Sequence, residues 1–176
     1  MKRPEFRPAQ AEEVARAFET EGVQYLFIGK SGAILLGYPG TTQDVDVFPE
    51  RSLENGRRIV AALRRIGFEV SGDLERGILA RNDFVQIKDG PFDVDLVFAP
   101  DGINSFAEAK SRGLREGVFW VANLRDIIAS KRASGRKKDE IELPLLENFR
   151  AEWEKNHPTE LLSAHEIAAR KSRDEE

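Results

Sequence analysis

Two separated segments of this chain alternate acidic with apolar residues, and this pattern constrains the fold more than any other feature. The first segment runs from Asp44 to Phe48 and the second from Phe92 to Phe98. Successive side chains of a strand point to opposite faces, so each segment predicts a strand with its acids on one face. The acids are Asp44, Asp46, Asp93 and Asp95. A chain of 176 residues is long enough for one ordinary domain with a full core.

Helical and strand patterns alternate along the rest of the chain. Helices are expected after Pro8, over 33–36, after Ser52, over 106–110, after Asn123 and over 139–153. Short strands are expected over 23–28, 68–70, 78–80, 84–87 and 118–121. The pattern predicts one α+β domain over 1–156, followed by a helical tail over 157–176 with an amphipathic helix over 159–170.

Composition excludes several kinds of functional site. The chain has no cysteine, so disulfides, thiolate zinc sites and cysteine nucleophiles are excluded, and its two histidines, His157 and His165, lie near the C-terminus. The formal net charge is −4, whereas a nucleic-acid binder is usually basic. No apolar run approaches the ~20 residues of a membrane span, and no apolar segment follows the first residues. We therefore expect a cytoplasmic protein with no membrane contact.

The four acids favour a site for a hard divalent cation. Carboxylates that converge from neighbouring strands repel one another unless a cation neutralises them. With no thiol and no nearby imidazole, such an all-oxygen set suits Mg²⁺ or Mn²⁺ rather than zinc. A solvated sheet face is the better interpretation of either acidic pair alone. Two pairs, each in a strand otherwise made of Val, Leu and Phe, favour a metal site instead.

A glycine-containing segment, Gly29-Lys30-Ser31-Gly32, precedes the first acidic strand. Glycine lets the backbone approach a phosphate closely, the following helix N-terminus favours an anion, and Ser31 adds a hydroxyl donor. The segment is not a P-loop, which requires glycine where this chain has Gln24. A tight turn is the alternative interpretation. The position just before the acids favours a triphosphate bound next to the metal.

Two stretches resemble the signatures of a known enzyme superfamily. The stretch from Ile28 to Asp46 resembles G-(G/S)-x-A-x4-G-x2-R-x-T-x-D-x-D, and the stretch from Leu124 to Asp139 resembles L-x-D-L-I-x-x-K followed by G-R-x-K-D. Both patterns are typical of the polymerase-β-like nucleotidyltransferase superfamily. The chain looks most similar to its minimal-nucleotidyltransferase and abortive-infection members, which occur in toxin–antitoxin and phage-defence systems. The resemblance covers about residues 23–149.

The resemblance implies a nucleotidyltransferase-like mixed sheet flanked by helices, and transfer of a nucleoside monophosphate from an NTP to an acceptor hydroxyl. Asp44 and Asp46 would hold the metals. Asp95 would be the third catalytic carboxylate and the base for the acceptor hydroxyl, with Asp93 as the alternative. The residues implied to bind the nucleotide are Gly29, Lys30, Ser31, Thr42, Lys131, Arg136 and Lys138. The implied acceptor is a partner toxin or antitoxin protein, or the 3′ end of a tRNA.

The chain departs from the superfamily pattern at two positions. Lys30 replaces the second glycine, and Gly40 replaces an arginine whose charge Lys30 could supply. Six basic residues and one acid lie between Arg125 and Lys138, which gives a local positive surface suited to phosphates. Asp139 is expected to cap a helix or form a structural pair. The runner-up interpretation is a catalytically inactive module that binds a partner protein, and a third is an antibiotic-modifying nucleotidyltransferase.

Overall fold

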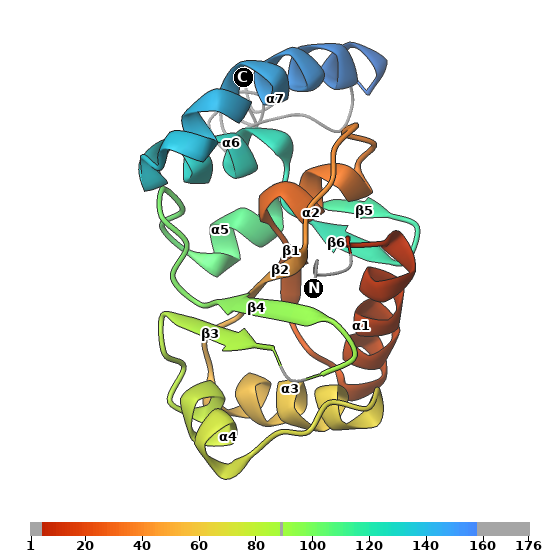
Figure 1. The fold of residues 1–176 in the computed structure, drawn as a ribbon, viewed down its shortest axis with the longest axis vertical. Helices are drawn as coiled ribbons and strands as arrows, with labels where there is room; N and C mark the ends of the chain where they lie inside the picture. The colour runs from red at the N-terminus through yellow and green to blue at the C-terminus, as the bar shows by residue number, and fades with distance from the viewer. Residues whose placement is uncertain (1–4, 89, 158–176) are drawn as a thin grey trace, which may run out of the picture.

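Both acidic segments lie in the middle of one mixed sheet. The computed structural model describes residues 5–88 and 90–157, and this part of the chain forms an α+β fold with six strands and seven helices (Figure 1). The elements in chain order are α1 (Pro8–Glu21), β1 (Tyr25–Phe27), α2 (Gly29–Leu35), β2 (Asp44–Pro49), α3 (Leu53–Arg65), α4 (Gly72–Leu79), β3 (Phe84–Ile87), β4 (Asp93–Val97), α5 (Phe106–Ser111), β5 (Leu114–Glu116), β6 (Phe119–Val121), α6 (Leu124–Ser134) and α7 (Lys137–Asn156).

The strand order in the sheet is β3-β4-β2-β1-β6-β5. β2 is parallel to β4 and β1 is parallel to β6, whereas the β1–β2, β3–β4 and β5–β6 pairs are antiparallel. Parallel neighbours require a crossover connection. Between β2 and β4 this connection consists of α3, α4 and the edge strand β3, and it brings the two acidic segments side by side.

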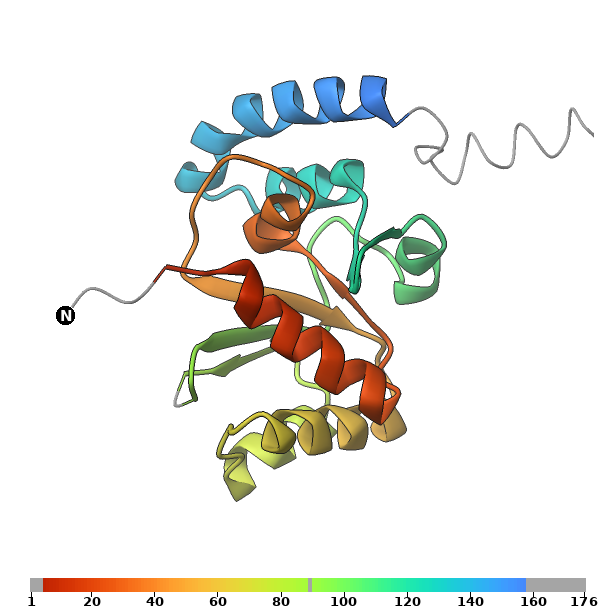
Figure 2. The same cartoon turned by 90° about the vertical axis from the view of Figure 1, so that its right-hand side faces the viewer.

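One face of the two central strands is fully covered. Val45 and Val47 of β2, and Val94 and Leu96 of β4, are at most 1 % exposed. Helix α1 lies across the sheet in Figure 2 and packs against α3, which lies beneath it. The apolar halves of the two alternating segments therefore form the centre of the core, as the alternation predicted.

Local signals explain where several helices begin and end. Ser52 and Asn123, the expected N-caps, accept hydrogen bonds from the backbone N–H groups of Asn55 and Asp126. Gly135 ends α6 in a left-handed conformation with φ of 65°. This turn folds α7 back onto α6, which in turn packs on α2, so the three helices are stacked in Figure 1 with α7 outermost and α2 nearest the sheet.

Three expectations about the elements are wrong, and one strand was not expected. Residues 68–70 form a loop, and residues 78–80 lie at the end of α4, because Ser71 caps a helix there by accepting a hydrogen bond from Leu74 N. Helix α2 begins at Gly29, four residues before its expected start. Strand β5 was not expected, and it pairs with β6 in a short hairpin.

The amphipathic helix expected over 159–170 lies outside the described residues. Among the helices of the described part, none has the length and the apolar character that crossing a bilayer requires.

Candidate active site

The register of β2 and β4 brings the four acids together. Asp44 lies opposite Asp93, and Asp46 lies opposite Asp95. Paired residues of neighbouring strands share a face, so all four side chains lie on the face opposite the apolar core. Asp95 is buried, with 8 % of its surface exposed, and the other three are half-buried. The structure thus brings together the carboxylates on which the sequence interpretation depends.

The two inner carboxyl groups share a proton. Burial, followed by the charges of Asp95 and Asp44, raises the pKa of Asp46 to about 8. Burial and the charge of Asp44 raise the pKa of Asp95 to about 6, although a hydrogen bond from Asp46 opposes this rise. In the absence of a cation, the pair therefore holds one proton near neutral pH. A positive charge placed beside these two acids would stabilise their ionised forms.

Gly29 allows the start of α2 to lie against Asp46. The residue has a φ of 64°, and a Cβ atom at this position would collide with Asp46 Oδ2. Only glycine fits both conditions without strain. The first turn of α2 therefore lies directly beside Asp46, and the glycine segment is part of this helix rather than a turn before it.

The Ser31 hydroxyl forms hydrogen bonds with backbone groups of the protein itself. Its side chain is fully buried, and its hydroxyl accepts a hydrogen bond from Asp46 N at 2.9 Å and donates one to Ile28 O at 3.2 Å. The hydroxyl expected to contact a triphosphate is therefore occupied in this structure. Its observed task is to fix α2 against β2 at the position of Asp46.

Two lysines approach the site from α2 and α6 and meet one glutamate. Lys30 Nζ lies 2.5 Å from Glu142 Oε1, and Lys131 Nζ lies 3.9 Å from Glu142 Oε2. Lys131, which is 12 % exposed, also contacts Asp139 Oδ1 at 3.2 Å, and its charge lowers the pKa of Asp46. Both lysines are thus paired with Glu142, and the charge of Lys131 also acts on Asp46.

Asp139 is the structural residue that the sequence predicted. It is 2 % exposed and accepts hydrogen bonds from Ser134, Arg136 and Lys131. Burial alone would raise the pKa of Asp139, but these hydrogen bonds and the charge of Lys131 outweigh it and lower the pKa to about 2. A permanent carboxylate at this position holds Lys131 and the α6–α7 turn in place.

The other three residues predicted to bind the nucleotide, Arg136, Lys138 and Thr42, have different surroundings. Arg136 is bonded to Asp139, with Nε 2.8 Å from Oδ2. Lys138 is exposed in the first turn of α7. Thr42 is half-buried in the loop before β2, where its carbonyl accepts a hydrogen bond from Phe6 N at 2.6 Å.

Sequence reasoning missed two charged residues of this region. Glu142 pairs with both lysines, and the charge of Lys88, at the end of β3, lowers the pKa of Asp95. A signal for Glu142 was its position one helical turn after Asp139, on the same side of the helix. No local signal identified Lys88, because its proximity depends on the pairing of β3 with β4.

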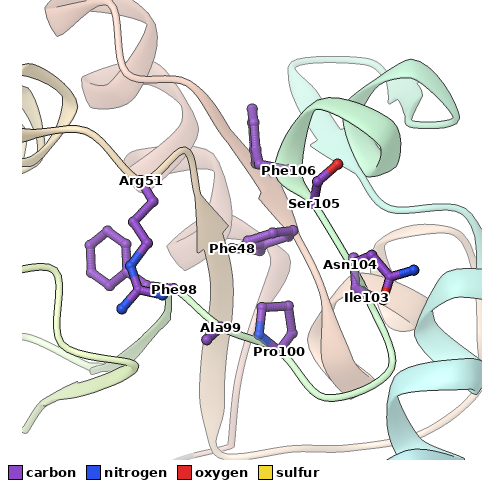
Figure 3. Close-up of a pocket in the computed structure, with 9 residues that line it drawn as sticks. All are labelled: Phe48, Arg51, Phe98, Ala99, Pro100, Ile103, Asn104, Ser105 and Phe106. Carbon is purple, nitrogen blue, oxygen red and sulfur yellow. The ribbon is translucent and has the colours of Figure 1, made fainter.

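Two hollows of similar size are found at the surface of the described part of the chain. The first, of about 300 Å³, is lined by Phe48, Phe98, Phe106 and Arg51 among others, and includes none of the predicted site residues (Figure 3). The second, of about 290 Å³, is lined by Asp93, Lys88, Gln43 and Gln10 among others. The second hollow is therefore the one that adjoins the carboxylates.

The donor set suits a hard cation in its chemistry. Within residues 5–88 and 90–157, no three acidic or histidine side chains are arranged around a common point at ligand distances, and Asp46 is hydrogen bonded to Asp95 instead. Their raised pKa values show that positive charge would stabilise both carboxylates. Carboxylate oxygens are ligands that Mg²⁺ accepts. Asp44, Asp46 and Asp95 therefore have the donor chemistry that such an ion accepts, but in this structure they are not grouped around a common point.

Comparison with known proteins gives no further identification. Neither a scan against protein families nor a search of curated proteins finds a match for this chain.

Proposed function

We propose that this protein is a metal-dependent nucleotidyltransferase with a nucleotidyltransferase-like sheet. The observation that supports the proposal most strongly is the in-register pair of Asp46 and Asp95, whose carboxyl groups share a proton beside the first turn of α2. Buried, mutually repelling carboxylates reduce stability, and such groups are concentrated at functional sites. The lysines at the same place supply the positive charge that a triphosphate needs.

Each residue of the site has a task in the proposed reaction. Asp44 and Asp46, with Asp95, would hold Mg²⁺ or Mn²⁺, which neutralises charge on the phosphates when bound. Asp95, with a pKa of about 6, is ionised at neutral pH and accepts the proton of the acceptor hydroxyl. The acceptor oxygen then forms a bond to the α-phosphorus, the bond from this phosphorus to the bridging oxygen breaks, and pyrophosphate leaves.

Binding of the triphosphate would replace an internal contact. Lys30 and Lys131 are both paired with the Glu142 carboxylate, which occupies them as a phosphate oxygen would. An incoming NTP must exchange with this carboxylate before either lysine can contact a phosphate. Arg136 and Lys138 lie at the start of α7, just before the Asp139 that contacts Lys131, and they would add positive charge for the same substrate.

The biological setting of the proposal follows from the resemblance of the sequence. We propose a cytoplasmic enzyme of a toxin–antitoxin or phage-defence system whose acceptor is a partner protein or a tRNA. The alternative is a catalytically inactive module that binds a partner. This alternative is favoured by Ile141 and Leu145, one turn apart on α7, which are 75 % and 58 % exposed.

A label-transfer assay separates the two functions. The protein is incubated with each α-labelled NTP, Mg²⁺ and either tRNA or candidate partner proteins. We expect label on one acceptor, and a loss of about 1,000-fold in Asp46→Asn, equivalent to several kcal/mol of transition-state stabilisation. Asp101→Asn, in an exposed loop, is the matched control and retains activity. No transfer and no Mg²⁺-dependent NTP binding would rule out the enzyme, and loss of partner binding in Leu145→Glu would then support the module.

A further inference from the structure

A cationic cluster lies near the edge of the sheet farthest from β3. Lys110 Nζ of α5 is 3.5 Å from the ring centroid of Trp120, and Arg115 Cζ is 4.9 Å from the same centroid. Arg115 of β5 lies directly opposite Trp120 of β6 in the ladder. Three elements of the fold thus place two positive charges on one indole ring, and we refer to Lys110, Arg115 and Trp120 as the tryptophan–cation cluster.

The indole ring holds these cations without neutralising them. A ring attracts a cation through its quadrupole but carries no net negative charge. Within the described residues, neither Lys110 nor Arg115 forms an ion pair, although Glu108 and Glu116 are close to them in sequence. Burial, followed by the charge of Arg115, lowers the pKa of Lys110 to about 8. The fold therefore keeps two like charges together against desolvation and repulsion.

A nearby basic residue with a structural role behaves differently. Arg112, two residues after Lys110, donates from Nε to Asp126 Oδ2 at 3.0 Å and from Nη2 to Asp126 Oδ1 at 3.2 Å. Such pairs satisfy the cation inside the protein and leave little charge for a ligand. The charge of the tryptophan–cation cluster is left for an anion that comes from outside.

The cluster lies on the acid-bearing face of the sheet. Phe27 pairs with both Val47 and Val121, so these three residues share the apolar face. Trp120 directly precedes Val121, and Asp46 directly precedes Val47. Because side chains alternate along a strand, Trp120 and Asp46 both lie on the opposite face. Strands β1 and β6 lie between β2 and β5. The three spacings from β2 to β5, each of ~4.8 Å, amount to about 14 Å.

We propose that Lys110, Arg115 and Trp120 form a phosphate-binding site whose ligand is the phosphodiester backbone of a polynucleotide. Arginine and lysine are the usual partners of phosphate oxygens. Neither hollow described above includes these residues. A polynucleotide binds through charge along its backbone and needs no cavity. The choice of a polynucleotide as ligand rests on the proposed function, in which RNA is one acceptor. The proposal that the cluster binds an anion does not depend on that function.

Oligonucleotide binding without NTP or Mg²⁺ tests this site independently of catalysis. Fluorescence anisotropy of a labelled single-stranded RNA is followed over a series of salt concentrations. The variant Lys110→Gln/Arg115→Gln keeps the aliphatic stems, and we expect about tenfold weaker binding and a salt slope smaller by about 1.4, or ~0.7 for each lost phosphate contact. The control Arg57→Gln/Lys155→Gln removes the same charge from exposed positions of α3 and α7, and binding should stay within about twofold of wild type.

The outcomes separate the site from the reaction. Equal binding by the cluster variant and wild type, or equal losses in both double variants, would overturn the proposal. Tighter binding of an acidic peptide or an anionic vesicle through the same two residues would overturn the choice of a polynucleotide. In Trp153→Phe, where Trp120 is the one remaining tryptophan, RNA should change the indole fluorescence, and an unchanged signal would also count against the site. RNA binding with no label transfer to any acceptor and no Mg²⁺-dependent NTP binding would support the site and rule out the proposed enzyme.

Discussion

The two faces of the β2–β4 pair are formed by alternating residues of the same strands, but they have opposite effects on the free energy of folding. On one face, Val47 and Leu96 are fully buried against the helices. On the other, Asp46 and Asp95 face each other and hold a proton near neutral pH. The apolar face supplies free energy of folding, because burial of aliphatic surface is favourable. The acidic face consumes part of it, because burial and like charge disfavour ionised carboxylates. Neighbouring residues of each strand therefore have opposite effects on the free energy of folding.

The largest effect is expected from the apolar face. Leu96→Ala removes a fully buried side chain at the centre of the core and leaves a cavity, which should lower the free energy of unfolding by about 2–5 kcal/mol. Urea denaturation monitored by circular dichroism measures this loss. Val97→Ala, at the neighbouring half-buried position, should lose clearly less. Equal losses at the two positions would mean that the faces do not differ as described.

The sequence predicted the division between these faces but not their alignment. Alternation alone placed Asp44 with Asp46 and Asp93 with Asp95, because the strand period is local. The match of Asp46 to Asp95 depends on a parallel pairing across a long crossover, which no local pattern specifies. The contact of Lys30 with Glu142 spans 112 positions and was missed for the same reason.

Capping residues predicted the start of some helices but not of others. Ser52 and Asn123 were predicted as N-caps, and both accept the expected hydrogen bonds. Ser71 is an equally good cap, but the apolar residues that follow it were too few to distinguish a short helix from a strand. The early start of α2 at Gly29 depends on packing against Asp46, which is a tertiary effect.

The second prediction concerns the pH dependence that the acidic face gives to folding. In the unfolded chain Asp46 loses its proton near the ordinary aspartate pKa of 3.8, whereas the folded residue keeps it until about pH 8. Between these values the unfolded state binds fewer protons, so the free energy of unfolding falls as pH rises. With EDTA present, we expect a fall on the order of 2 kcal/mol from pH 5 to pH 8. Urea midpoints measured across this interval test the prediction.

Two variants determine whether the acidic pair causes this fall. Asp46→Asn removes the shared proton and should flatten the dependence on pH, while the exposed Asp101→Asn should leave it unchanged. The interval ends at pH 8 because Lys110, whose pKa is lowered to about 8, adds a dependence of opposite sign above that value. A flat wild-type profile would show that the carboxylates are solvated and do not oppose folding.

The smallest effect is expected at the contact between the acidic face and the helices above it. Glu142→Gln removes the carboxylate that pairs with Lys30 and Lys131, so an incoming triphosphate no longer competes with a negative charge. We expect about fivefold tighter NTP binding, equivalent to ~1 kcal/mol, measured by isothermal titration with Mg²⁺. Glu140→Gln, exposed on the same helix, is the matched control. Weaker binding in Glu142→Gln would show that this glutamate positions the lysines rather than competing with the substrate, and the acidic face would then extend onto α7.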